Sequence, residues 1–256
     1  LFTIALAAVF APLIARDPLA LEPINRLKAP SAEFWLGTDS LGRDIYARMV
    51  YGARISLLVG LTVAFFSVLA GAVIGLIAGY FPRIDAVVMR LMDGLMAIPS
   101  ILLAIALVSL LGASVKVVIV AIVIPEIPRV TRLVRAVVLS VRDLPYVEAA
   151  RSNGTRVGKL LRRHILPSTV APLIVQATYI CASAILTEAG LGFLGAGTPP
   201  EFPTWGNMIA SSRLYLQIAP WTIFAPGICL ALVVLAVSLL GEGLRDRLDP
   251  RISRRM

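Results

Sequence analysis

Charged residues are scarce in this sequence of 256 residues. They make up 15% of the chain, and hydrophobic residues 58%, whereas an average soluble domain is about 25% charged. Four stretches, at residues 55–82, 94–115, 165–187 and 214–241, contain no charge at all. About 20 apolar residues span the hydrocarbon core of a bilayer. The sequence therefore predicts an all-α polytopic membrane protein, and it excludes a soluble enzyme, a disordered chain and a secreted disulfide scaffold.

Cysteine and histidine are nearly absent. Cys181 and Cys229 lie inside apolar stretches, with neither a metal-binding spacing nor a disulfide framework. The single histidine, His164, stands among arginines, so no Ser-His-Asp triad and no His-ligated metal cluster can be built. We therefore predict no catalytic residue, no metal site and no bound cofactor, which argues against a membrane-embedded enzyme.

A phosphate-binding loop is also missing. The segment from Gly154 through Gly158 to Lys159 and Leu160 has three residues between its glycines. The nucleotide-binding pattern needs four residues there and a Ser or Thr after the Lys to hold magnesium. This chain is not expected to bind ATP by that route.

The apolar stretches predict six membrane-spanning helices. They cover about residues 1–15, 55–80, 94–112, 115–138, 166–188 and 215–241, and the first opens without a Met inside an apolar run, so we expect it to be clipped. A short interfacial helix over about 42–54 is predicted to lead into the second span.

The net charge of +9 follows these spans instead of forming a nucleic-acid-binding patch. Sixteen of the 24 Lys and Arg residues fall in segments 81–93, 126–164 and 242–256, and eight fall on the other side. Because Lys and Arg concentrate on the cytoplasmic side, we predict that both termini and the 139–164 loop are cytoplasmic.

Some features within the predicted spans allow two interpretations. Gly71, Gly75 and Gly79 recur on one helix face, where small residues permit close packing either within the chain or with another subunit. Glu126 and Glu188 are acids next to apolar runs, for which structural pairing or exposure at an interface is favoured and a functional role stays open. Arg129, Arg132 and Arg135 share a face and are predicted to reach lipid headgroups or an adjoining protein.

The segment 143–167 is predicted to form two short helices joined by a glycine. Asp143 can cap the first helix, with Pro145 in its first turn, and Gly154 is a natural left-handed terminator. Thr155 can cap the second helix, to which Leu160 and Leu161 give an apolar edge. This unit is either an amphipathic helix on anionic lipid or a docking element for a cytoplasmic partner.

This segment resembles the EAA loop of ABC importer permeases. The resemblance rests on Glu148-Ala-Ala150, Gly154 and His164-Ile-Leu-Pro167, where His-Ile-Leu-Pro is the form common in the dipeptide and oligopeptide branch. Three more stretches are similar to the C-type subunit of that branch. They are Trp35 to Asp44 with Gly52 to Ser56, Gly192 to Gly195 with Pro199, Pro200, Trp205 and Gly206, and Gly241 to Arg251.

The resemblance implies a type I importer permease fold. It divides the chain into a first helix with an extracytoplasmic segment (1–53), a transmembrane domain with the EAA loop (54–243) and a basic cytoplasmic tail (244–256). It also implies a homologous second permease, one or two ABC ATPase subunits that bind the ATP, and an extracytoplasmic substrate-binding protein. The EAA helix of the family inserts into a groove of the ATPase, which assigns coupling to Glu148, Ala149, Ala150 and Gly154, with Leu160 and Leu161 beside them.

The substrate implied is a di- or oligopeptide, imported across the bacterial inner membrane. Nickel, glutathione and other small solutes use similar permeases, so they stay as alternatives. An ion-coupled secondary transporter is the other alternative, but it should show internal repeats and ionisable groups at the midplane, and the six unequal spans show no convincing repeat.

Overall fold

The computed structural model describes residues 1–199 and 201–248, and in these residues the chain is helical without a β-strand. The α-helices are α1 (Phe2–Val9), α2 (Ala11–Ile14), α3 (Ile45–Tyr80), α4 (Pro82–Ala97), α5 (Ser100–Leu111), α6 (Val115–Val141), α7 (Pro145–Ser152), α8 (Val157–Leu160), α9 (Leu166–Phe193), α10 (Trp205–Ser212) and α11 (Trp221–Leu248). Short turns at η1 (Pro23–Asn25), η2 (Leu161–Ile165) and η3 (Arg213–Tyr215) complete them.

Three helical runs are long and apolar enough to cross a membrane: α3, the continuous run Val157–Phe193, and α11. The pair α4 and α5 qualifies as a fourth only if taken together, because the two are bent by 86°. α6 has 27 residues but carries a glutamate and three arginines inside it. The described residues thus contain three or four of the six predicted spans by length and composition.

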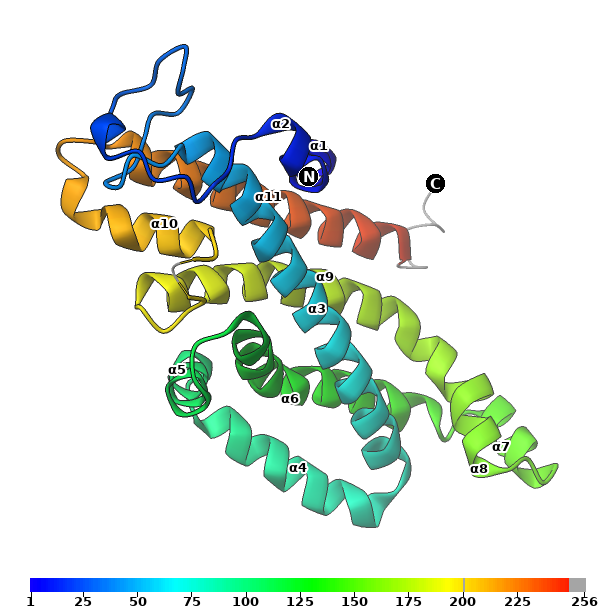
Figure 1. Ribbon diagram of the computed structural model, residues 1–256. Helices are drawn as coiled ribbons and strands as arrows, with labels where there is room; N and C mark the ends of the chain where they lie inside the picture. Colours follow the sequence, from blue (N-terminus) through cyan, green and yellow to red (C-terminus); the bar gives the residue numbers. More distant parts are fainter. Residues whose placement is uncertain (200, 249–256) are drawn as a thin grey trace.

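The predicted first span, residues 1–15, is wrong as one helix. The helix stops at Val9, and Phe10 leaves helical geometry before the short α2 begins at Ala11. Within the given sequence α1 has eight residues, Phe2 to Val9. It lies beside α3 (Figure 1).

The predicted span 94–112 is also wrong in its bounds. α4 starts at Pro82 and ends at Ala97, and α5 starts after Pro99. Proline lacks an N–H and forces the residue before it out of helical geometry, and Ile98 is accordingly extended, with φ −92° and ψ 127°. The apolar composition predicted the stretch correctly but not the sharp bend inside it.

α3 is longer than predicted. It runs without a break from Ile45, so the separate interfacial helix expected over 42–54 is the first part of the same helix. Asp44 caps it, because its carboxylate accepts a hydrogen bond of 2.9 Å from the N–H of Tyr46. α3 is the central helix of the bundle and packs against α6 and α9 (Figure 1).

Glycines bring α3 close to α6 of the same chain. Gly71, Gly75 and Gly79 lie against Val130, Val134 and Val138, so the two backbones approach over about two turns. A Cβ on Gly75 would stand 2.7 Å from the carbonyl oxygen of Thr131, closer than real Cβ contacts. Of the two interpretations of this stripe, the structure shows packing within the chain.

Ion pairs join α4 to α6. Arg135 donates to both oxygens of Asp85, at 2.5 and 2.6 Å, and Arg132 donates to Asp93 at 2.5 Å. The prediction that these arginines reach for headgroups or another protein is therefore corrected, since both have carboxylate partners inside the chain. The pairing was hidden in the sequence because its partners are 39 and 50 residues apart.

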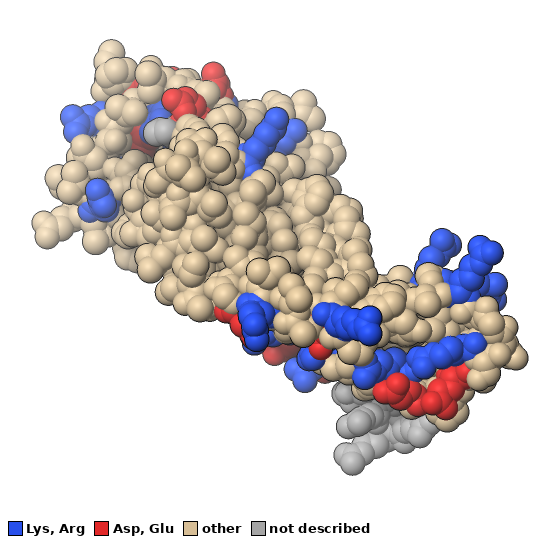
Figure 2. All heavy atoms as spheres, turned by 90° about the horizontal axis from the view of Figure 1, so that it is seen from below, with Lys and Arg blue, Asp and Glu red and all other residues tan. Residues whose placement is uncertain are grey.

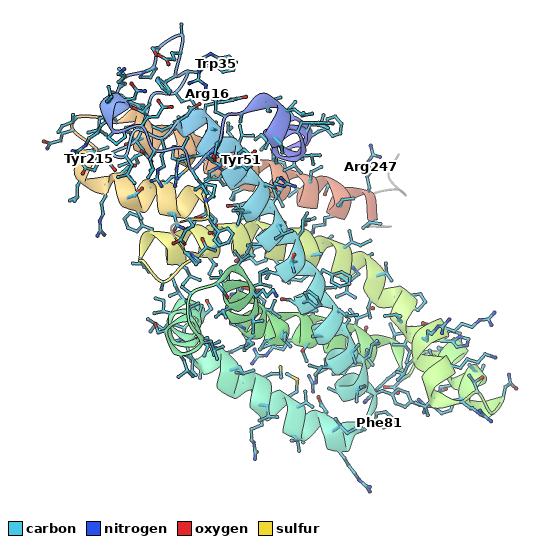
Figure 3. The ribbon with its side chains drawn as sticks, viewed as in Figure 1. Arg16, Trp35, Tyr51, Phe81, Tyr215 and Arg247 are labelled. Carbon is cyan, nitrogen blue, oxygen red and sulfur yellow. The ribbon has the colours of Figure 1, made fainter. Side chains whose placement is uncertain are left out.

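The two ends of the bundle differ. α7 and α8 form one end with the last turn of α3, and residues 16–44 with α10 form the other (Figure 1). Figure 3 labels Trp35 and Tyr215 at the second end and Phe81, directly after α3, toward the first. At the second end Asp39 pairs with Arg43 at 2.7 Å, and the indole of Trp205 donates to the carbonyl of Met49 at 3.1 Å.

Candidate coupling helices and polar groups of the bundle

α7 exposes two of the predicted coupling residues, Glu148 and Ala149. The helix starts at Pro145, whose missing N–H costs nothing in a first turn. Its N-cap is Leu144 without a side-chain hydrogen bond, so the predicted cap at Asp143 is wrong. Val147 is fully buried, Ala150 is half-buried, and Glu148 and Ala149 are exposed. Glu148 and Ala149 thus belong to the surface of the unit, and Val147 belongs to its core.

Gly154 turns the chain between the two short helices. Its φ is +73°, the left-handed conformation predicted for it. The N–H of Gly154 donates to Arg151 at 3.0 Å and that of Thr155 to Ala150 at 3.1 Å, which closes the end of α7. The next helix has Arg156 as its N-cap and no side-chain cap, so the predicted role of Thr155 is wrong.

The second short helix is continuous with a membrane-spanning helix. α8 passes through the π-helical turn η2 into α9, giving one helical run from Val157 to Phe193. Leu160 is fully buried and belongs to the core cluster, and Leu161 is half-buried beside it. Leu160 therefore anchors the unit to its own chain, while the surface is left to other residues. α8 is thus joined to the bundle by one continuous helical run.

Further contacts fix the unit to the end of α3. The guanidinium of Arg142 donates to the carbonyl of Gly79 at 3.0 Å, and Arg151 lies 5.8 Å from the ring centre of Tyr80. The hydroxyl of Tyr146 donates to the carbonyl of His164 at 3.3 Å, which ties α7 to η2. Positive side chains gather at this end, as Figure 2 shows, including Arg156, Lys159, Arg162 and Arg163, all exposed.

The α7–α8 unit is a projection of the bundle. Two helices meet at a glycine, protrude beyond the bundle and continue into it. In the described residues no group of three or more His, Cys, Asp and Glu stands close enough to hold a metal ion. His164 contributes its carbonyl oxygen to the hydrogen bond with Tyr146.

Comparison with known proteins identifies the family. Residues 71–254 match the family described as binding-protein-dependent transport system inner membrane component. The chain belongs to this family. It is therefore an inner-membrane permease subunit of a transport system that works with a binding protein.

Two curated relatives extend the match over nearly the whole chain. A probable peptide ABC transporter permease protein of Sinorhizobium fredii is 61% identical over 98% of this chain and 86% of its own. A dipeptide transport system permease protein of Alkalihalophilus pseudofirmus is 48% identical over 96% of this chain and 82% of its own.

A solved structure supports the fold. The permease resembles a chain of the MetNI methionine ABC transporter in an inward-facing conformation, with a TM-score of 0.65 at 18% identity. The likeness covers 80% of this chain and 98% of that one. The type I importer permease fold implied by the sequence is thus supported over most of the permease.

The permease also holds two polar groups inside its bundle. Glu188 on α9 is fully buried, so the expected exposure at an interface is wrong; its Oε2 accepts from the hydroxyl of Ser56 on α3 at 3.2 Å. Glu126 on α6 is 5% exposed and pairs with Arg129 at 3.2 Å, the structural pairing favoured from the sequence. The guanidinium of Arg129 also stacks near Tyr179 of α9, 6.0 Å from the ring centre.

Sequence reasoning missed the partners Ser56 and Tyr179. Ser56 is 132 residues from Glu188, and Tyr179 is one of six tyrosines with no local motif around it. Only the charge of Glu188 and Glu126 next to apolar runs gave a signal, and it did not indicate which side chains they meet.

Proposed function

We propose that this permease is one of two homologous membrane subunits of an ATP-driven importer and that it carries di- and oligopeptides inward. The observation that carries the proposal is the α7–Gly154–α8 unit, with exposed Glu148 and Ala149 and a rigid continuation into α9. The names of the two curated relatives support peptides as the substrate class.

The partners follow from this role. ATP is bound and hydrolysed by one or two kinds of ATPase subunit, which receive α7 and α8 through Glu148, Ala149, Ala150 and Gly154. A substrate-binding protein docks at the opposite end, on residues 16–44 and α10. The permease itself needs neither a cofactor nor a nucleic acid, and it works embedded in the lipid bilayer with its second permease.

The topology that suits this role has six spans, with both termini and the 143–167 loop in the cytoplasm. The concentration of Lys and Arg in 81–93, 126–164 and 242–256 supports it. The domain division at 1–53, 54–243 and 244–256 follows the same scheme. Most of the basic tail, residues 249–256, lies outside the described residues.

The mechanism is alternating access driven by the ATPase. When the ATPase dimer closes, it moves the two docked units, and each unit moves its bundle through the helical run from Val157 to Phe193. Arg142 and Arg151 link the same unit to the end of α3, so α3 and α9 move with it. The coupling requires close contact and stiffness but no titrating group.

Ala149→Glu tests this function. Ala149 is exposed, so the substitution should leave the isolated permease folded and assembled with its second permease. In the complex it places a charge without a partner into a desolvated contact, which should lower binding-protein-stimulated hydrolysis and peptide uptake about tenfold or more. Both the hydrolysis and the uptake can be measured with complexes reconstituted in liposomes. Uptake of labelled dipeptide is compared there with uptake of glutathione and of nickel.

Ser140→Glu is the matched control. It adds the same carboxylate at an exposed residue near the end of α6, outside the α7–α8 unit, and should keep uptake within about twofold of the native level. The permease purified alone should hydrolyse no ATP. Hydrolysis by the isolated permease, or normal uptake with Ala149→Glu, would contradict the proposed function.

A further inference from the structure

Arg129 stands deep in the apolar part of the bundle. Its neighbour Val130 packs against Gly71, which lies inside the charge-free stretch 55–82 of α3. Gly71 is nine residues before the end of α3 at Tyr80, or about 14 Å at 1.5 Å per residue. Tyr179, the other neighbour, lies inside the charge-free stretch 165–187. Two packing contacts thus place Arg129 at the level of apolar helix segments.

Arg129 is nevertheless open to its surroundings. Its side chain is 42% exposed although its partner Glu126 is buried, and Tyr179 is 57% exposed. A charged side chain at membrane depth rarely faces lipid and almost always faces a water-filled cavity or another polar group. The exposed side of Arg129 therefore faces water or a partner subunit.

The guanidinium keeps donors available. Only Nη1 contacts Glu126, at 3.2 and 3.4 Å from its two oxygens. In the part of the chain that the structure describes, Nε and Nη2 donate to no acceptor. Glu126 and the ring of Tyr179 hold the planar group from two sides and leave the remaining edge free, the edge that binds a carboxylate through two parallel hydrogen bonds.

A groove of the bundle lies near this group. It measures about 640 Å³ and lies between α6, α9 and α11, lined by Leu133, Pro172, Val175, Gln176 and Arg245 among others. Leu133 follows Arg129 by one helical turn, and Gln176 precedes Tyr179 by one turn. Arg129 and Tyr179 therefore each stand one helical turn from a residue that lines the groove.

We propose that Arg129 lines the translocation path and binds the carboxylate of the transported peptide, with Glu126 and Tyr179 as its positioning residues. This inference rests on the proposed function, because it takes a peptide as the cargo. A carboxylate on the second permease has the same chemistry and would make Arg129 a structural contact between subunits instead.

The accessibility of position 129 to a water-soluble reagent distinguishes a residue of the translocation path from a contact between subunits. In the assembled complex carrying Cys181→Ala and Cys229→Ala, an Arg129→Cys variant should react with a negatively charged, membrane-impermeant methanethiosulfonate reagent. Excess alanyl-alanine, added with the binding protein and ATP, should slow this reaction. Leu235→Cys is the control, because Leu235 is an exposed apolar residue of α11 and should stay unreactive. An unreactive Arg129→Cys, or one that peptide does not protect, would overturn the proposal.

Transport tests the binding step. Uptake of labelled alanyl-alanine should fall about tenfold with Arg129→Gln. It should fall less with Arg129→Lys, because the lysine ammonium keeps the positive charge but not the two parallel hydrogen bonds of a guanidinium. Arg90→Gln, which removes an exposed arginine of α4, should leave uptake unchanged. ATP hydrolysis stimulated by the binding protein should persist in all three variants.

The outcomes distinguish a failure of the role of Arg129 from a failure of the proposed function. If native complexes take up peptide and Arg129→Gln does so equally well, the role of Arg129 is wrong while the proposed function stands. If native complexes show no peptide uptake at all, the proposed function itself fails.

Discussion

At the scale of single residues, the contact of three glycines with three valines decides how α3 and α6 pack. Gly71, Gly75 and Gly79 leave no room for a side chain, because a Cβ at any of them would overlap a valine of α6. Close packing of this kind gives van der Waals attraction its full strength, which matters in lipid, where hydrophobic burial adds little. The stripe therefore holds α6, which bears Arg129 and leads into the coupling unit, against α3.

Gly75→Val should destabilise the permease. The added Cβ would meet the carbonyl oxygen of Thr131 at 2.7 Å and Val134 at 2.8 Å, so the backbones must separate. Overpacking of this type costs about 1–3 kcal/mol. Thermal unfolding of the purified permease in detergent, followed by tryptophan fluorescence, should show a clearly lower midpoint.

Gly227→Val is the control for that experiment. Gly227 also lies inside a long helix, α11, but a Cβ there would meet nothing within 4 Å. Its midpoint should stay close to the native one. Equal midpoints for the two variants would show that α3 and α6 do not depend on close contact.

At the scale of elements, the π-helical turn η2 joins the α8 helix to the α9 span. Single π turns inside α-helices are rare, and here Leu161–Ile165 stands between the coupling unit and the bundle. Buried Leu160 and Ile165 hold both ends of the turn in the core. The unit is therefore fixed on the α8 side, and its freedom lies at Gly154.

Gly154→Val tests that freedom. A Cβ at Gly154 would touch nothing within 4 Å, so the only cost is the left-handed backbone at φ +73°. A β-branched residue there costs roughly 1–2 kcal/mol or more, which should turn α7 away from α8 without unfolding the bundle. Hydrogen exchange of residues 145–165 should become faster, and ATPase co-purification should fall.

Gly158→Val separates this conformational effect from the simple addition of bulk. Gly158 is equally open but lies in the helix α8, without a positive φ. In the isolated permease its exchange rates should match the native ones. If both variants exchange alike, the left-handed turn does not set the geometry of the unit.

Sequence reasoning succeeded where structure depends on neighbouring residues. Charge-free stretches predicted α3, α9 and α11, because partition into lipid depends on local composition. The glycine at position 154 predicted a left-handed turn, because few other residues adopt that φ. It failed where the outcome depends on distant residues. The short helix α10 and the pairs Arg132–Asp93 and Glu188–Ser56 all depend on what the folded chain brings near.

The same limit applies to the coupling residues. The sequence grouped Leu160 and Leu161 with the surface residues of the unit, since an apolar edge on a short helix has the same pattern whether it faces a partner or its own core. The structure turns Leu160 fully inward. Whether Leu160 is buried depends on how α9 is placed in the folded bundle. The residues around Leu160 in the sequence do not determine that placement.

At the scale of the whole molecule, the two ends of the bundle are built for different tasks. One end carries α7, α8 and a cluster of exposed arginines, with α3 and α9 leading into it (Figures 1 and 2). The other end is a folded layer in which Asp39, Arg43 and the buried Arg48 hold residues 16–44 onto the start of α3. A movement that begins at the first end must cross the entire bundle to reach the second.

The orientation of these ends can be tested by labelling single cysteines in intact cells. Starting from Cys181→Ala and Cys229→Ala, the variants Ala32→Cys and Glu201→Cys should react with an impermeant maleimide from outside, since both residues are exposed. Asn153→Cys, also exposed, should react only after the membrane is opened, because residues 139–164 around it carry six of the 24 basic residues. Asn153 labelled from outside would reverse the topology and leave the coupling unit on the side away from the ATPase subunits.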